Sequence, residues 1–192
     1  GKQKYTIRIS KLKNEISTSN NQRDIFIDVI ENRQNVLIIA NAPHPDVKAI
    51  KRALGRNKNL LVESFTVKGF QMANMKEEIE KSSLVVLHQL PTNKNPGNEI
   101  FDLIDRGKKS VMVIVGNQTN IRGLNRIFPE VGIQFRRKSM NNALPDLNPG
   151  FTYFNLPENI REVSSEYPPL KSPFGKYQVE PTHQNLFNQR IG

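Results

Sequence analysis

The feature that most constrains the fold is an apolar run that breaks into a polar turn and continues as a helix. Residues 36–40 read Val-Leu-Ile-Ile-Ala, and the turn at 41–46 follows with two prolines. Residues 47–56 then carry apolar side chains at helical spacing, which predicts one core-facing stripe. An apolar run, a short turn and an amphipathic helix together predict the first strand–helix unit of a parallel sheet.

The same alternation of strand and helix patterns recurs along the middle of the chain. It predicts an α/β fold in three layers, a mostly parallel sheet with right-handed crossovers and helices on both faces. Further strands are expected at 60–67, 83–91 and 109–117, and further helices at 75–81, 98–106 and 121–128.

The pattern weakens beyond residue 131. There we expect two short strands, coil between them, a weak helix and two final strands. These elements are expected at 133–137, 151–154, 157–165, 177–179 and 186–189, with coil from 138 to 150. The last residues are hydrophobic, from which we expect the native domain to continue past residue 192.

Two alternating segments precede the first strand of the parallel sheet. Residues 4–10 and 24–30 place apolar side chains at every second position, and turn-forming residues connect them. This predicts an antiparallel strand pair, which either extends the main sheet or ends a preceding β domain. We favour the second alternative, with residues 1–33 as the strand pair and 34–192 as the α/β domain.

Composition excludes several classes of function. The chain has no cysteine, so disulfides, thiolate metal sites and cysteine nucleophiles are excluded.

The net charge of +10 raises the hypothesis that the chain binds nucleic acid. The basic residues are scattered, however, and no binding signature accompanies them, so we expect a solvated basic surface and no nucleic-acid partner. No apolar run reaches the length of a membrane helix. Membrane contact is therefore expected only through segments outside this sequence.

Polar side chains follow three of the expected strands, at the point where each strand ends. Because the carboxyl ends of neighbouring parallel strands meet at one edge of a sheet, we expect these side chains to converge there. The candidate ligand-binding residues are Asn41, His44, Asp46, His88, Gln89 and Asn117.

Each ionisable residue of this set also has a structural interpretation. His44 and His88 can act as general bases or metal ligands, with Asp46 orienting an imidazole. Asp46 is equally typical of a helix N-cap, His44 of a plain turn residue, and His88 of a hydrogen-bonded core histidine. We favour the structural interpretation for all three residues.

The usual motifs of cofactor and metal sites are missing. No glycine-rich phosphate loop and no GxSxG elbow follows any strand. The three histidines occur without cysteine and without an HxH or HExxH spacing, which does not favour zinc. We therefore expect no cofactor and no metal ion, and assign no catalytic residue.

Residues 36–46, with the Ala-Ile and Ala-Leu pairs of the following helix, resemble a group of uncharacterised bacterial envelope proteins. Residues 83–91 and 173–177 strengthen the resemblance, which covers most of 4–192. It implies a flavodoxin-like domain similar to the class I glutamine amidotransferase fold, placed after immunoglobulin-like β segments. It also implies a membrane-anchored parent protein with this domain on the extracytoplasmic face of the cell envelope.

The amidotransferase fold normally carries its nucleophilic cysteine at a strand-to-helix elbow, which would fall here near residues 115–118. The chain has no cysteine, so glutaminase activity is excluded. We expect a non-catalytic α/β binding or architectural domain whose partner is an unknown protein or a neighbouring domain of the same polypeptide. The alternative is a small-ligand-binding or hydrolytic domain that uses the polar residues at the strand ends, so enzymatic activity stays open.

Overall fold

A computed structural model describes residues 2–28, 33–69 and 72–191 of the chain. The chain divides into two compact units, Gly1–Arg33 and Gln34–Gly192, and each is described by itself. Among the described residues, no helix combines the length and the apolar character that crossing a membrane requires.

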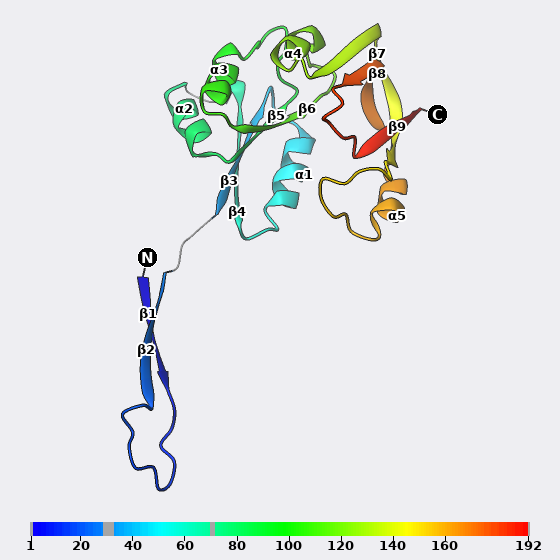
Figure 1. Cartoon of the computed structure of the whole chain (residues 1–192). Coiled ribbons are helices and arrows are strands. Elements are labelled where there is room, and N and C mark those ends of the chain that lie inside the picture. The colour runs from blue at the N-terminus through cyan, green and yellow to red at the C-terminus, as the bar shows by residue number, and fades with distance from the viewer. Residues whose placement is uncertain (1, 29–32, 70–71, 192) are drawn as a thin grey trace. The chain divides into compact units, whose positions relative to one another are not determined.

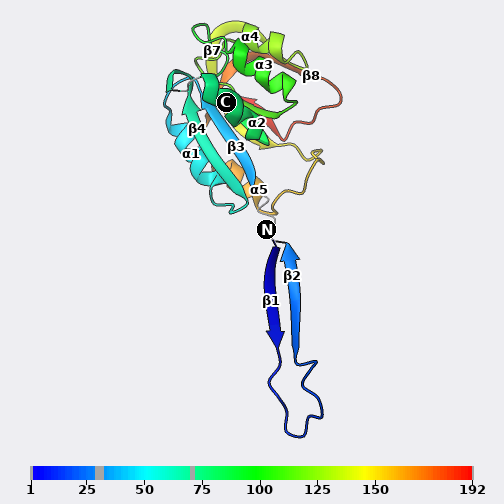
Figure 2. The same cartoon turned by 90° about the vertical axis from the view of Figure 1, so that its left-hand side faces the viewer.

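The first unit is an antiparallel pair of strands, β1 (Lys2–Arg8) and β2 (Gln22–Asp28). Figure 2 shows the two strands side by side, joined by a long connection. The predicted pair is confirmed, although positions 29 and 30 of its second segment lie outside the described residues. Tyr5 and Phe26 are exposed, so the pair buries little apolar surface. Its assignment to an immunoglobulin-like domain stays a prediction.

The second unit is built on a parallel sheet of four strands in the order β4-β3-β5-β6, as expected from the alternating pattern. The strands are β3 (Gln34–Ala40), β4 (Leu60–Thr66), β5 (Leu84–His88) and β6 (Ser110–Ile114). The helices that alternate with them are α1 (Pro45–Leu54), α2 (Met72–Lys81), α3 (Asn98–Arg106) and α4 (Ile121–Ile127), with the short 3₁₀ turn η1 (Val67–Gly69) before α2.

Helices cover both faces of this sheet, which confirms the predicted layers. Figure 1 shows α2 and α3 on one side of the sheet and α1 on the other. Leu37 and Ile39 of β3 face α2 and α3, whereas Val36 and Ile38 face α1. Alternate side chains of a strand point to opposite faces, so a continuous apolar run is what a strand covered on both sides requires.

Two helices of the parallel part begin earlier than predicted. Helix α1 begins at Pro45 instead of residue 47, because His44 takes the N-cap position and the ring of Pro45 is compatible with the first helical turn. Helix α2 begins at Met72 instead of residue 75. Gly107 follows the last residue of α3, and Asn120 caps α4.

The C-terminal part forms a second sheet, antiparallel, in the order β8-β7-β9. Its elements are β7 (Val131–Leu147), α5 (Ile160–Ser165), β8 (Leu170–Val179) and β9 (Phe187–Ile191). The coil predicted at 138–150 is wrong, because β7 runs through most of it. Its register shifts between Phe135 and Met140, which breaks the alternating pattern that would have marked one long strand.

The edge strand predicted at 151–154 is also wrong. These residues form no strand, and their aromatic rings cluster instead, with the Phe151 and Phe154 centroids 4.8 Å apart. Aromatic residues favour strands only where a neighbouring strand offers a pleated surface to pack on, and here they pack on one another.

Candidate functional site

The two central strands of the parallel sheet, β3 and β5, end side by side, with Ala40 in register with His88. The order of the strands reverses at this point, since the chain leaves β3 toward β4 and returns past it to β5. In open α/β sheets, ligands bind in the crevice at such a reversal, outside the carboxyl ends of the strands.

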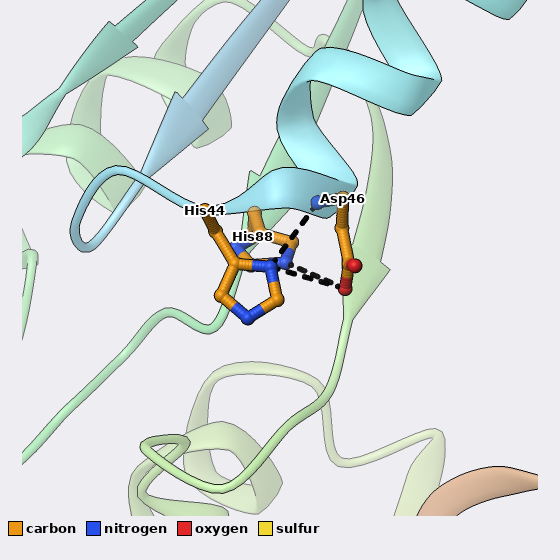
Figure 3. A group of neighbouring side chains, drawn as sticks. All are labelled: His44, Asp46 and His88. Carbon is orange, nitrogen blue, oxygen red and sulfur yellow. Dashed lines mark hydrogen bonds and ion pairs between the residues drawn. The ribbon is translucent and has the colours of Figure 1, made fainter.

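Three ionisable side chains converge at this crevice. Figure 3 shows His44 and Asp46 at the start of α1 and His88 at the end of β5. Oδ2 of Asp46 lies 3.3 Å from Nδ1 of His44 and 3.4 Å from Nε2 of His88. The two imidazole centroids are 4.7 Å apart, and one ligand atom from each of the three residues lies within 4.8 Å of the others.

The start of α1 fixes two of these side chains. His44 has an extended backbone and its Nδ1 accepts a hydrogen bond from the backbone N–H of Asp46 at 3.2 Å. The N-cap predicted at Asp46 is therefore wrong. Asp46 stands in the first helical turn, where the helix dipole stabilises a carboxylate and the side chain is free to contact both imidazoles.

These contacts place acceptor atoms face to face. An imidazole nitrogen that accepts the cap bond carries no proton, so Nδ1 of His44 has nothing to donate to the carboxylate 3.3 Å away. His88 can donate its Nε2–H to Asp46. On the His44 side, a proton or a cation at Nδ1 would make the contact with the carboxylate favourable, and it would replace the cap hydrogen bond.

Exposure differs sharply within the cluster. The side chain of His88 is 2% exposed, whereas those of His44 and Asp46 are 38% and 56% exposed. One wall of the cluster is therefore buried in the sheet and the other meets solvent. An ion held there would keep coordination positions open to water or a ligand.

A network of amides ties together the turns that follow β3, β5 and β6. Asn41 accepts a hydrogen bond from Nδ2 of Asn95 at 2.7 Å and donates one to Oε1 of Gln118. The backbone N–H of Gln118 donates to Oε1 of Gln89 at 3.2 Å. The turns that carry the cluster are thus held by side chains of their neighbours.

Gln89 needs an unusual backbone and a close neighbour to make these contacts. Its φ is 55°, in the left-handed region. A Cβ at Gly116 would lie 2.7 Å from Cδ of Gln89, so any larger residue at that position would displace the Gln89 side chain. This close approach places Gln89, the residue after His88, against the turn that follows β6.

The six predicted site residues separate into three groups. His44, Asp46 and His88 form the cluster, and Asn41 and Gln89 belong to the amide network. Asn117 is exposed and makes no hydrogen bond to the described residues.

Two residues of the network, Asn95 and Gln118, were not predicted from the sequence. Asn95 lies in a Thr-Asn-Lys-Asn-Pro-Gly loop whose composition is that of an ordinary turn. The position of Gln118, beside Asn117 after a strand, was the only signal for it.

Comparisons of the chain with protein-family models, with curated proteins and with solved structures found no significant match. The family resemblance read from the sequence therefore stays a prediction.

Proposed function

We propose that the α/β unit is a metal-binding domain that holds a divalent transition-metal ion through His44, Asp46 and His88. The observation that carries the proposal is the convergence of three ligand atoms on one point where the strand order reverses. The expectation of no metal ion rested on spacing along the sequence. The ends of the adjacent strands β3 and β5, however, bring His44 and His88 together, although the two residues are 44 positions apart in the sequence.

Two of the three ligand–ligand distances fit a tetrahedral ion. Zinc lies about 2.0–2.2 Å from imidazole nitrogen and carboxylate oxygen, which makes each edge of the ligand tetrahedron about 3.4 Å. Two edges of the cluster measure 3.3 and 3.4 Å. The third pair is separated by at most 4.8 Å, so the partly exposed His44 side chain has to move and exchange its cap hydrogen bond for the ion.

The donor atoms favour transition metals over magnesium or calcium. Mg²⁺ and Ca²⁺ prefer ligand sets made of oxygen, whereas imidazole suits zinc, iron, nickel and copper. Two histidines and one carboxylate, with the remaining positions facing solvent, are typical of sites that bind a further ligand on the ion.

The proposal keeps the binding role predicted from the sequence and gives it a location. We also propose the flavodoxin-like, amidotransferase-like assignment of the fold. Numbered along the parallel sheet alone, the observed order is 2-1-3-4, the beginning of the flavodoxin order 2-1-3-4-5. The place in a bacterial envelope protein is supported by the sequence resemblance alone.

Metal binding by the full chain tests the proposal. After treatment with a chelator, the protein is titrated with Zn²⁺ in a calorimeter, and we expect one ion per chain. The variants are His44→Asn, which retains an N-cap residue, Asp46→Asn and His88→Gln. We expect each to weaken binding by more than about tenfold, since losing even an outer-shell partner costs about 10–100-fold.

His183→Ala is the control, because His183 is exposed and its ring contacts only the neighbouring Thr182. It is expected to bind Zn²⁺ as tightly as the unchanged chain. Equal binding by Asp46→Asn and the unchanged chain would assign the cluster to a hydrogen-bonded structural role instead.

A further inference from the structure

A hollow of about 320 Å³ lies beside the metal-binding cluster, between the start of α1 and the end of β4. His44 lines it, so the hollow and the cluster share a wall. Its volume is at the lower end of the range of small-molecule sites, about 300–1,000 Å³. A small ligand therefore fits it.

The walls of the hollow combine apolar groups with positive charge. Ala42, Pro43 and Val47 supply apolar surface next to His44. Lys48 and Lys51 follow on α1, four and seven positions after His44, and both line the hollow. Both lysines therefore border the hollow that His44 lines.

These two lysines form no ion pair with any residue in the described part of the chain. Ser64 and Thr66, at the end of β4, add hydroxyl groups to the opposite wall. Two unpaired cations, hydroxyl donors and a small apolar surface favour an anionic head joined to a short apolar body.

We propose that this hollow binds a small amphiphilic anion, a carboxylate or a phosphate monoester, next to the metal ion. The inference rests on the proposed metal site. Lys48 and Lys51 attract the anionic head, and the apolar body covers Ala42, Pro43 and Val47. Because His44 belongs to both sites, a ligand in the hollow alters the coordination of the ion.

The test uses the full chain loaded with Co²⁺, whose visible absorption reports its coordination. The probes are hexanoate and hexyl phosphate, with hexanol as the uncharged analogue and acetate as the analogue without an apolar body. We expect at least one of the two amphiphilic anions to bind more tightly than both analogues and to shift the Co²⁺ absorption. Tighter binding of hexanoate identifies a carboxylate, and tighter binding of hexyl phosphate a phosphate monoester.

The double variant Lys48→Gln/Lys51→Gln is expected to bind the anion about two- to tenfold more weakly, as losing two exposed charge contacts implies, and to retain Co²⁺. The control, Lys11→Gln/Lys13→Gln, removes the same net charge from the first unit and should bind the anion unchanged. An equal loss in both double variants attributes binding to overall charge and overturns the inference.

Failure of the two proposals is distinguishable. A normal Co²⁺ spectrum that none of the anions changes overturns this inference and leaves the metal site standing. If no Co²⁺ binds, the metal site is refuted and the inference falls with it.

Discussion

Replacing Gly116 with alanine tests whether the turn after β6 packs closely on Gln89, the residue that follows His88. The added Cβ would lie 2.7 Å from Cδ, 2.9 Å from Cγ and 3.0 Å from Nε2 of Gln89. These separations are shorter than van der Waals contact, so Gln89 must move. Its side chain is buried and its Oε1 accepts a hydrogen bond from Gln118, so movement breaks a contact.

The expected effect follows from these distances. Overpacking a filled site costs about 1–3 kcal/mol, and the loss of glycine's freedom in the unfolded chain offsets about 0.4–1 kcal/mol of it. We expect the free energy of unfolding to fall by about 1–2 kcal/mol. With a urea dependence of about 1–3 kcal/mol/M, the unfolding midpoint falls by about 0.3–2 M.

Urea unfolding followed by circular dichroism measures the change. Gly132→Ala is the matched control, because the nearest atom to a Cβ there lies 3.8 Å away, an ordinary contact. We expect that variant to keep or slightly raise the free energy of unfolding.

A double-mutant cycle identifies the cause. Gln89→Ala removes the three atoms that the new Cβ would meet. In that background, Gly116→Ala should cost almost nothing, so the coupling free energy should be about 1–2 kcal/mol. If Gly116→Ala is equally destabilising with and without the Gln89 side chain, the proposed contact is not the reason for the glycine.

Two further predictions concern other parts of the chain. Asn120→Ala removes the side-chain oxygen that accepts a hydrogen bond from the N–H of Gly123 at 3.1 Å. Urea unfolding should show a free energy of unfolding about 1 kcal/mol lower. The control Asn117→Ala, at an exposed position in the same loop, should change that free energy by less than about 0.5 kcal/mol. In the first unit, hydrogen bonds from Lys4 and Thr6 hold the pKa of Asp24 below its ordinary value of 3.8. A lowered pKa stabilises the strand pair above that ordinary value, and the contribution is lost as the pH falls through the lower, folded-state pKa. Carbon-13 titration of the Asp24 carboxyl should show the low pKa, and Asp24→Asn should remove this part of the acid sensitivity; an Asp24 that titrates at its ordinary value would contradict the prediction.

The parallel sheet could be predicted because its strands are buried on both faces. Residues 36–40 and 84–88 are almost wholly apolar, and this pattern has few alternatives once helices separate the runs. The C-terminal sheet could not be predicted in the same way. β7 is polar along much of its length, its register shifts, and its partners lie more than 25 residues away in sequence. A local sequence pattern does not indicate which distant strands pair with β7.

The convergence of the candidate residues could be predicted from the sequence, but the contacts within the cluster could not. Parallel strands place their carboxyl ends at one edge, so the convergence of His44 and His88 follows from topology. The contact of Asp46 with both imidazoles depends on which residue caps α1. The backbone conformation of the turn before α1 decides which residue is the cap, and composition and spacing do not specify that conformation.

X-ray absorption of the zinc-loaded full chain tests the central claim most directly. The proposed metal site predicts a first shell of nitrogen and oxygen atoms at about 2.0–2.1 Å, with the multiple-scattering signal of two imidazoles. His88→Gln should reduce that signal to one imidazole, and His183→Ala should leave it at two. A shell without imidazole scattering, or one that His88→Gln does not change, would contradict the assignment of the ion to His44, Asp46 and His88.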